Sequence, residues 1–498
     1  MNKFKKILIA NRGEIAVRII RACRELDIQA IALYAPEDQD GFWIGLADEA
    51  HEIKKLHGSK AYLNIEAILE IAKRSKADAI HPGYGFLSED ARFAQACAEN
   101  GIHFIGPTPS AMRTMGNKTE ARKLAKSLGI PLLPGTDTLP NLQAAEKEAA
   151  ILGYPLLFKA AAGGGGRGMR LVQQQSDLRN TFESASREAL ASFGDGSLYL
   201  EKVVAHPRHI EIQILADQHG NRIHLGEREC SIQRKYQKLI EESPSPAVDE
   251  TLRNKLGDCA LRMAETTGYT NAGTVEFLLD ENKQFYFLEI NARLQVEHPV
   301  TEWVTGIDLV KAQIRIAQGE KLPWRQDEIH LNGWAIEARV NAENPELDFL
   351  PSTGKVKRLM IPGGPGVRVD TALYSDYSIP DEFDSLIAKV IAFGDSRDEA
   401  LSRLKRALFD FRIGGIATSI PFILQILKSQ KFNDGNLSTR FLEEEKQMLA
   451  PILTEGEMKL AAILAAVESQ KSSIQFSEPM RDNLWSRAGR LENVAAFP

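Results

Sequence analysis

Apolar and polar residues alternate along residues 285–302, which read FYFLEINARLQVEHPVTE. A period of two predicts an extended segment with one apolar face and one polar face. Over residues 289–297 the polar face carries carboxylate, amide and guanidinium groups but no lysine or hydroxyl: Glu289, Asn291, Arg293, Gln295 and Glu297. Such groups bind metal ions and anions. For this segment taken alone, the alternative is a solvated face of an antiparallel strand.

A second apolar stretch, residues 272–279, precedes this segment across a polar loop at residues 280–283. The two stretches predict a β-hairpin. In the expected register Glu276 lies opposite Phe287 and has Glu289 as its diagonal neighbour, with Cβ atoms roughly 7 Å apart. Without a metal this face would carry uncompensated like charge, and its oxygen ligands suit Mg²⁺ or Mn²⁺ completed by substrate phosphates. The predicted metal ligands are Glu276, Glu289 and Asn291.

Short apolar runs and helical patterns also alternate through the first hundred residues, which predicts an α/β domain ending near residue 115. Strands are expected at residues 6–10, 30–34, 77–80 and 104–106, and helices after residue 13, over residues 62–73 and after residue 90. The first turn has the single Gly13 and lacks G-x-G-x-x-G spacing, so a dinucleotide-binding fold has little support.

Two further features point to phosphate. Residues 115–118 predict the opening of a helix with Lys118 near its start, where the helix dipole disfavours a cation. A bound phosphate would resolve this anomaly, and an exposed surface lysine is the alternative. The strand at residues 154–159 ends in Lys159 and leads into four successive glycines at residues 163–166. Bare backbone N–H groups favour a phosphate-covering flap over a linker, although the spacing is not that of a Walker loop.

The polar runs that follow leave alternatives open. Glu201 and Lys202, in a strand at residues 198–203, either read an adenine edge or form an exposed ion pair of little worth. Alternation at residues 209–215 places His209, Glu211 and Gln213 on one strand face. The dense polar run at residues 227–238 is either a solvated face or the floor of an anion site. Its Cys230 is interpreted as a small packing residue, because no histidine is paired with it in a motif.

The last part of the chain predicts a third domain and a tail. Residues 334–341 alternate, with Glu337 and Arg339 on the polar face, and residues 396–411 form an amphipathic helix. These elements indicate a mixed α and β domain. Residues 447–498 begin with an alanine-rich helical stretch and read as an appended extension.

Composition narrows the classes of function. A chain of 498 residues is expected to hold about three domains. The formal net charge of −6 gives no case for binding nucleic acid or an anionic membrane. Four cysteines without C-x-x-C spacing fit a reducing compartment and argue against a zinc site. With neither a signal peptide nor an apolar run of membrane-spanning length, a cytoplasmic protein is expected.

From residue 6 to about residue 445 the chain resembles biotin carboxylase, the ATP-grasp component of biotin-dependent carboxylases. The resemblance rests on motifs in family order: IANRGEIAVRIIRACRE, HPGYGFLSE, KAAAGGGGRGMR, ECSIQRKYQK and EINARLQVEHPVTE. It implies an α/β and α+β fold in three domains. These are a Rossmann-like domain at residues 1–115, an ATP-grasp domain at 116–330 with a mobile lid at about 132–204, and a C-terminal biotin carboxylase domain at 331–446, with the tail at 447–498.

The resemblance also implies site residues. The ATP site is expected to contain Lys118, Lys159, Gly163, Gly164, Gly165, Gly166, Glu201, Lys202, His209, Gln233, Tyr236, Glu276 and Leu278. Bicarbonate is expected at Lys238, Arg293, Gln295 and Val296, and biotin at Tyr84 and Arg339. The catalytic groups are expected to be Lys238, Arg293, Glu297 as general base, and Arg339 as the partner of the biotin enolate. The strict alternation is expected to end near Asn291, because the later side chains must surround a small anion.

The implied reaction is ATP-dependent carboxylation of biotin through carboxyphosphate, with two Mg²⁺ or Mn²⁺ ions. The implied partners are a biotin carboxyl carrier protein and carboxyltransferase subunits, as in acetyl-CoA carboxylase and fatty acid biosynthesis, and the chain itself is expected to be a homodimer. A split pyruvate, propionyl-CoA or other acyl-CoA carboxylase is an alternative setting. Another ATP-grasp ligase, as in carbamoyl phosphate synthesis, is disfavoured because this chain does not duplicate its ATP-grasp unit.

The chain departs from the family pattern at three places. Tyr236 stands where histidine is common, Ala292 where threonine or proline is usual, and residues 380–384 replace a more aromatic turn. None of these changes removes an expected catalytic group, although the first bears on nucleotide affinity.

The extension after residue 447 exceeds a minimal biotin carboxylase, so we predict that it docks a partner protein. A chain lacking residues 450–498 should recover less carrier protein and carboxyltransferase in a pull-down than the full chain. Equal recovery by the two chains would contradict this prediction.

Overall fold

The computed structural model describes residues 3–54, 56–161 and 169–449, together with Lys459, Ala462, Ile463 and Ala466. The chain divides into two compact units, Met1–Leu449 and Ala450–Pro498. In the second unit the four described residues are helical. The rest of the predicted extension from residue 450 onward lies outside the described residues.

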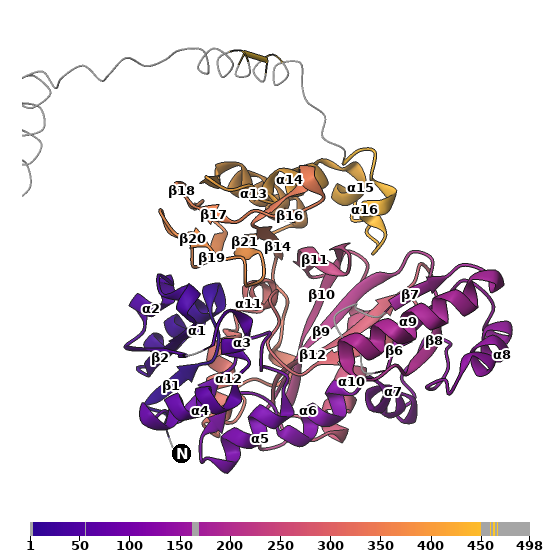
Figure 1. Ribbon diagram of the computed structural model, residues 1–498, viewed down its shortest axis with the longest axis horizontal. Helices are drawn as coiled ribbons and strands as arrows, with labels where there is room; N and C mark the ends of the chain where they lie inside the picture. The colour runs from indigo at the N-terminus through magenta and orange to yellow at the C-terminus, as the bar shows by residue number, and fades with distance from the viewer. Residues whose placement is uncertain are drawn as a thin grey trace, which may run out of the picture. The chain divides into compact units, whose positions relative to one another are not determined.

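The first unit begins with the predicted α/β domain, drawn in indigo to purple in Figure 1. Its parallel sheet has the strand order β3-β2-β1-β4-β5. Ile7 and Ile9 enter one hydrophobic cluster while Leu8 enters another, so both faces of β1 are buried and its sequence is continuously apolar. The elements are β1 (Lys6–Ile9), α1 (Gly13–Glu25), β2 (Gln29–Tyr34), α2 (Phe42–Leu46), β3 (Glu49–Glu52), α3 (Ser59–Tyr62), α4 (Ile65–Arg74), β4 (Ala79–His81), α5 (Ala91–Glu99) and β5 (His103–Phe104).

Two predicted helices are divided by caps that the periodicity did not indicate. The helix expected over residues 62–73 is instead α3 and α4, and the side chain of Asn64 caps the latter by accepting from the N–H of Ala67 at 2.8 Å. Residues 115 and 116 end α6 (Pro109–Gly116) rather than opening a helix. Asn117 caps the next helix, α7 (Lys118–Ser127), so Lys118 does lie at a helix start as predicted.

The segment predicted as a lid contains a small antiparallel sheet with strand order β7-β6-β8. Its elements are α8 (Leu142–Leu152), β6 (Leu156–Ala160), β7 (Met169–Val172), α9 (Leu178–Phe193) and β8 (Leu198–Lys202). Phe158 and Leu200 are buried on one face of these strands. Helix α9 packs against β6 and β8 (Figure 1). By alternation, the opposite face carries Lys159, Tyr199 and Glu201.

An eight-stranded antiparallel sheet, in the order β13-β12-β9-β10-β11-β14-β21-β19, forms the centre of the unit. It crosses the domain boundary expected near residue 330, because β11 pairs with β14 and places Glu241 opposite Glu337. The strands are β9 (Arg208–Ala216), β10 (Arg222–Arg234), β11 (Gln237–Ser243), β12 (Asn271–Leu279), β13 (Phe285–Asn291), β14 (Trp334–Asn341), β19 (Val367–Thr371) and β21 (Leu386–Gly394).

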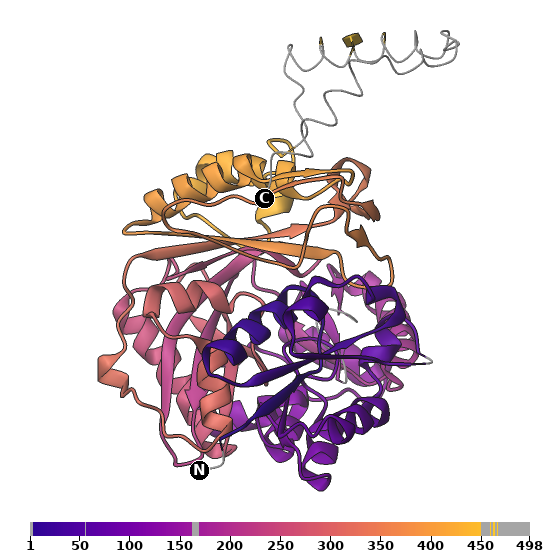
Figure 2. The ribbon, with the colours of Figure 1, turned by 90° about the vertical axis from the view of Figure 1, so that its left-hand side faces the viewer.

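Helices cover this sheet along its length. α10 (Glu250–Thr266) contacts β9 and β10, α12 (Leu309–Ala317) contacts β12, and α11 (His298–Thr305) contacts β10, β11, β14 and β21. In Figure 2 the orange α13 (Arg397–Asp410) lies over the C-terminal strands, and it contacts β14 and β21. The predicted strand at 334–341 and the predicted helix at 396–411 are thus confirmed. The remaining elements are β15 (Glu343–Asn344), β16 (Leu350–Pro351), β17 (Gly354–Lys355), β18 (Arg358–Met360), β20 (Ser378–Ile379), β22 (Arg412–Gly414), α14 (Ile420–Lys428), α15 (Gln430–Asn433) and α16 (Phe441–Glu444).

The polar run at residues 227–238 forms the β10–β11 hairpin. Residues 227–232 are buried, with Arg228 at 0% exposure, so the solvated-face interpretation is wrong for them. The two strands are joined by Lys235 and Tyr236, with φ of 49° and 67°. Two successive positive φ angles match the primed turns that favour tight hairpins. In this turn Tyr236 is 56% exposed to solvent.

The β12–β13 hairpin differs from the predicted register. Leu279 pairs with Phe285 and Phe277 with Phe287, and a β-bulge then places Glu276 directly opposite Glu289 rather than diagonal to it. The bulge and the longer loop arise from local backbone conformation, which alternation alone does not indicate. β13 ends at Asn291, where the strict alternation was predicted to end.

Phe277 provides a test of the hydrophobic packing beneath this hairpin. It is 0% exposed and its ring meets Phe285 edge-on at 5.7 Å between centroids. We expect Phe277→Ala to lower the free energy of unfolding by about 3–5 kcal/mol, because the lost contacts leave a cavity. Thermal or urea unfolding measures the change. Leu347→Ala, at a side chain 58% exposed, serves as control with an expected change below about 0.5 kcal/mol; equal losses in the two variants would contradict the prediction.

Candidate active site

The predicted metal ligands lie together on the β12–β13 hairpin. Glu276 is buried, and it accepts a hydrogen bond from Nδ2 of Asn291 at 2.8 Å. Glu289, its register partner, is less buried and forms an ion pair with Lys118 at 2.9 Å. Two carboxylates and an amide oxygen on adjacent strands are a donor set that suits a hard divalent cation.

This face does not carry the uncompensated charge that was predicted for it. Glu276 contacts His209 Nε2 at 3.0 Å and Lys238 Nζ at 3.2 Å, while Lys118 neutralises Glu289. Burial opposes ionisation of Glu276, but Lys238 and His209 outweigh it and hold the pKa of this carboxyl well below its usual range. Internal cations therefore already balance both predicted metal-binding carboxylates.

Lys238 is the common partner of three buried carboxylates. Its Nζ lies 2.6 Å from Glu297, 2.7 Å from Glu211 and 3.2 Å from Glu276. These carboxylates also take part in the two clusters of metal-binding residue types found among the described residues: His209, Glu211 and Glu276, and Glu211, Cys230 and Glu297. Because the Lys238 ammonium contacts the carboxylates of both clusters, it supplies the positive charge that these groups require.

Glu297 lies between two cations. Lys238 contacts its Oε1, and Nη2 of Arg339 donates to its Oε2 at 2.8 Å. Burial raises the pKa of Glu297, but Lys238, Arg339 and Arg228 lower it further, so its pKa is well below the usual value and the side chain is ionised. Cys230, with Sγ 3.9 Å from Glu297, has its pKa raised well above the usual value, chiefly by burial, and is a thiol at neutral pH.

Glu211 and Glu241 were not singled out from the sequence as site residues, and Arg228 was considered only as part of the polar run at residues 227–238. Arg228 donates from Nε to Glu211 at 2.5 Å and from Nη1 to Gln213 at 2.8 Å. Glu241 accepts from Nε of Arg339 at 2.5 Å. The alternation at residues 209–215 did place Glu211 on the same face as His209, but only the pairing of strands β9, β10 and β11 brings its cationic partners to it.

Arg293 and Gln295 form the predicted bicarbonate side of the site. Arg293 donates to Glu89 at 2.8 Å, to Gln295 at 2.8 Å and to Asn291 at 3.1 Å. The buried Nε2 of Gln295 has no hydrogen-bond partner within the described residues. A buried amide N–H without an acceptor is costly, so this position fits a bound anion. The carbonyl of the neighbouring Val296 accepts from Nζ of Lys389 at 2.8 Å.

Tyr84, one predicted biotin contact, is held by residues that the sequence did not single out. Its hydroxyl donates to Glu14, and Oε1 of Glu14 lies 3.2 Å from Nζ of Lys389. Burial and the neighbouring Glu14 raise the pKa of Tyr84 well above its usual value, so the phenol stays neutral. Lys389 therefore links the residue predicted to contact biotin with the backbone predicted to contact bicarbonate.

The predicted ATP residues divide into three groups. Glu201 forms ion pairs with Lys159 and with Arg122, a residue the sequence did not single out. Lys202 lies apart from them, because its Nζ donates to the carbonyls of Gly153 and Tyr154 at 2.9 and 3.0 Å. Of the others, Gln233 donates to Nδ1 of His209 at 2.7 Å, Leu278 pairs with His209 across β9 and β12, and Tyr236 lies in the exposed turn. Gly163, Gly164, Gly165 and Gly166 lie outside the described residues.

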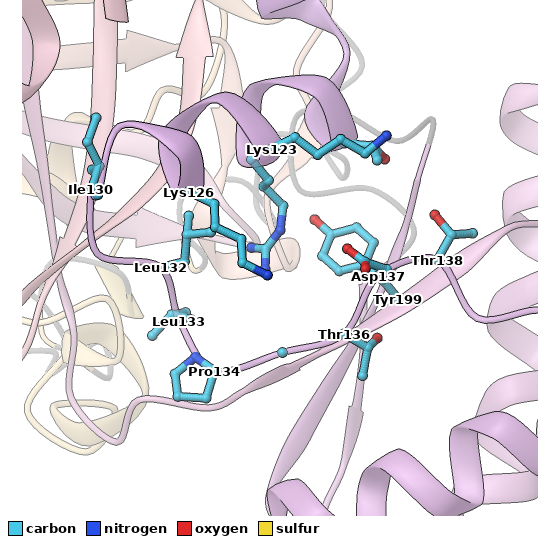
Figure 3. A pocket seen from close by; sticks show the side chains of 14 residues that line it. Lys123, Lys126, Ile130, Leu132, Leu133, Pro134, Thr136, Asp137, Thr138 and Tyr199 are labelled. Carbon is cyan, nitrogen blue, oxygen red and sulfur yellow. The ribbon is translucent and has the colours of Figure 1, made fainter. Parts of the chain in front are cut away.

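A cavity of about 430 Å³ lies beside this group (Figure 3). It is lined by α7, by the segment at residues 129–138 and by Tyr199. Its polar lining includes Arg122, Lys123 and Asp137. The cavity therefore borders the ion pairs of Glu201 on the side of α7.

Buried acidic groups also surround Arg339. Glu241 and Glu337 are register partners on β11 and β14, and both are 0% exposed. Neither oxygen of Glu337 has a hydrogen-bond partner in the part of the chain that the structure describes. Burial raises the pKa of Glu241 to about 7 and raises that of Glu337 well above its usual value. Glu337 is therefore the member of the pair that holds a proton at neutral pH.

Replacing Glu337 tests this protonation state. A carboxyl whose folded-state pKa is raised contributes stability that is fully present below its ordinary pKa and is lost as pH rises through the folded value. Glu337→Gln removes this titration. We therefore expect the melting temperature of the variant, relative to that of the wild type, to increase from about pH 5 upward. Thermal unfolding across pH 5–9 provides the measurement. Exposed Glu346→Gln serves as control, and a pH-independent difference for Glu337→Gln would contradict the assignment.

Three families match the chain in order. Residues 3–112 match the biotin carboxylase N-terminal domain, residues 117–325 the carbamoyl-phosphate synthase L chain ATP-binding domain, and residues 337–444 the biotin carboxylase C-terminal domain. Among the described helices, none is both long enough and apolar enough to span a membrane.

Curated relatives match over most of their own length. Biotin carboxylase 1 of Bacillus subtilis is 52% identical over 441 residues, covering 88% of this chain and 98% of the relative. A pyruvate carboxylase subunit of Methanothermobacter thermautotrophicus is 50% identical over 445 residues, covering 89% of this chain and 90% of the relative.

Solved structures share the fold of the chain. The biotin carboxylase domain dimer of Hydrogenobacter thermophilus 2-oxoglutarate carboxylase, in complex with MgADP, ADP and bicarbonate, matches with a TM-score of 0.88 and 46% identity, covering 91% of this chain and 100% of that one. A β-γ-ATP complex of Campylobacter jejuni biotin carboxylase matches with a TM-score of 0.87 and 46% identity, covering 89% and 99%.

Proposed function

The chain belongs to the biotin carboxylase family, and from this premise we propose that it carboxylates biotin with bicarbonate at the expense of ATP. The observation that carries the proposal is the position of Glu297. Its carboxylate contacts both Lys238 and Arg339 and follows directly on the segment that holds Arg293 and Gln295. One ionised base thus adjoins both an anion site and the proposed biotin site.

ATP is proposed to bind with its phosphates at Lys118, at Lys159 and at the glycines of residues 163–166. The oxygens of Glu276, Glu289 and Asn291 would hold Mg²⁺ or Mn²⁺, with two ions expected. When bound, such ions would supply positive charge that neutralises the charge moving with the transferred phosphoryl group. Lys118, now paired with Glu289 at 2.9 Å, is proposed to move to a phosphate and leave Glu289 available as a metal ligand.

The other proposed nucleotide contacts lie on strands β8, β9, β10 and β12 and in the β10–β11 turn. They are Glu201, Lys202, His209, Gln233, Tyr236 and Leu278. Because the Lys202 ammonium is held by two backbone carbonyls, its proposed contribution is through its own backbone, next to Glu201.

Bicarbonate is proposed to bind between Lys238, Arg293, the amide of Gln295 and the backbone of Val296. Arg293 suits an oxyanion because its guanidinium is planar and always charged. Glu297 then removes the bicarbonate proton, and the resulting carbonate attacks the terminal phosphorus of ATP to give carboxyphosphate and ADP. Once the anion shares Lys238, this cation stabilises the Glu297 carboxylate less, which makes Glu297 a stronger base.

Carboxyphosphate is proposed to break down into CO₂ and phosphate beside biotin. The phosphate takes the proton from the ureido nitrogen of biotin, and this nitrogen attacks CO₂. Arg339 is proposed to pair with the developing enolate oxygen, because its guanidinium is fixed by Glu241 and Glu297 before biotin arrives. Tyr84 would line the same pocket.

Biotin is proposed to arrive on a carrier protein, and the product to pass to a carboxyltransferase. The name of the matched Methanothermobacter relative describes one subunit of a carboxylase, and the matched Hydrogenobacter structure is a dimer, which supports a homodimer within a larger complex. Acetyl-CoA carboxylase is the first proposed setting. A pyruvate or other acyl-CoA carboxylase is the second, supported by the relative that is named for pyruvate carboxylase.

Bicarbonate-dependent ATP hydrolysis with and without free biotin tests this function. The wild-type chain should be stimulated by biotin and form carboxybiotin. Glu297→Gln should lose at least about a hundredfold of this activity, because the base is removed, while its Kd for ATP stays within about threefold. Glu281→Gln, on the exposed hairpin loop, is the matched control and should retain activity. A wild-type chain without biotin stimulation and without carboxybiotin would refute the proposal.

A further inference from the structure

Arg122 on α7 is a charged residue to which no role has been assigned. Its Nη1 contacts Oε1 of Glu201, and Nζ of Lys159 contacts Oε2 of the same carboxylate. Arg122 belongs to α7, Glu201 to β8 and Lys159 to β6. The contact therefore joins α7, which starts at Lys118, to the small β7-β6-β8 sheet. Resting on the ATP-dependent function proposed above, we infer that Arg122 is a positioning residue that retains Glu201 when Lys159 moves to the ATP phosphates.

The burial of these groups makes a second cation necessary. The side chains of Arg122, Lys159 and Glu201 are 15%, 10% and 4% exposed. A buried carboxylate that loses its cation is strongly destabilising. If Lys159 were the sole partner of Glu201, ATP would have to leave that carboxylate unpaired in order to bind the lysine. With Arg122 in place, Glu201 keeps a charged partner and Lys159 is available to the phosphates.

The same arrangement recurs at the other lysine proposed to bind phosphate. Lys118 forms an ion pair with Glu289 at 2.9 Å, and Glu289 is a proposed metal ligand. When Lys118 moves to a phosphate, the metal replaces it beside Glu289. No metal is proposed at Glu201. There Arg122 supplies the positive charge that remains beside the carboxylate when the lysine leaves.

The surroundings of Arg122 fix its guanidinium without burying it in the core. The guanidinium carbon lies 5.3 Å from the ring centroid of Tyr199, a largely buried side chain of β8. Tyr199 also lines the cavity beside α7 (Figure 3). The hydrophobic contacts of α7 come from Ala121, Leu124 and Ala125 instead. Substitution at residue 122 therefore removes a charge next to an existing cavity and leaves the helix packing in place.

Steady-state kinetics of bicarbonate-dependent ATP hydrolysis test the role. Arg122→Gln should raise KM for ATP about tenfold, with KM for bicarbonate within about twofold, because only Lys159 becomes harder to detach. Arg122→Lys, which keeps the charge, should restore most of the loss. Glu201 is itself a proposed nucleotide contact, so the double variant is compared with Glu201→Gln alone. In that background Arg122→Gln should change KM for ATP by less than about twofold, because no buried carboxylate then needs Lys159.

Lys123→Gln is the matched control. Lys123 is the neighbouring helix residue, lines the same cavity and is 62% exposed, and its ion pair is with Glu120. Its variant should keep the wild-type KM for ATP. Direct titration with ATP in the absence of bicarbonate should give a raised Kd for Arg122→Gln and a Kd close to that of the wild type for Lys123→Gln. Melting temperatures identify any variant that fails to fold. If Arg122→Gln alone fails to fold, the double variant still reports on Lys159, because it retains no buried carboxylate at residue 201.

The outcomes separate the two proposals. A wild-type chain without bicarbonate-dependent ATP hydrolysis would refute the function. An active wild type with an unchanged KM for ATP in Arg122→Gln would refute the role of Arg122 alone. A rise in KM for ATP on Arg122→Gln that is as large in the Glu201→Gln background as in the wild type would also refute it, because the defect would then not arise from Glu201.

Discussion

The Lys238 ammonium is surrounded by carboxylates from three parts of the fold: Glu211 of β9, Glu276 of β12 and Glu297 at the start of α11. Each of these carboxylates is buried and would repel the others without a shared cation. Lys238 reaches all three because β11 runs antiparallel to β10 after the Lys235–Tyr236 turn and places Lys238 opposite Gln233. The position of the base, the position of the proposed metal ligands and the floor of the proposed bicarbonate site therefore all depend on this one buried charge.

The site is organised as ion pairs that substrates can exchange. Lys118 holds Glu289, Lys159 holds Glu201, and Lys238 holds Glu297. Each lysine is proposed to turn to an anionic substrate group, so binding replaces one ionic partner by another instead of stripping water from an isolated charge. Arginines remain at the carboxylates that are left behind, Arg122 at Glu201 and Arg339 at Glu297. Arginine is suited to this role because it stays charged when buried.

The continuous sheet explains why residues far apart in sequence meet. β14 belongs to the C-terminal part of the chain, yet it pairs with β11, and this pairing sets Arg339 beside Glu241 and Glu297. Lys389 of β21 reaches Val296 and Glu14 from the same side. The proposed biotin site is thus shared between the N-terminal domain and the far half of the sheet, and neither part would position it alone.

The sequence by itself determined the order of domains, some of the helices and strands in each domain, and the family, because periodicity and long motifs are local properties of the chain. It also indicated Glu276, Glu289 and Asn291 as neighbours and the end of alternation near Asn291. The tertiary structure alone decided which cation meets which carboxylate. The pairing of β11 with β14 and the partners Glu211, Arg228, Arg122 and Lys389 depend on contacts between segments distant in sequence. The β-bulge that sets Glu276 opposite Glu289 depends on local backbone conformation that alternation does not indicate. Alternation shows which face a charge occupies, but the balance of buried charges is set only when several strands come together.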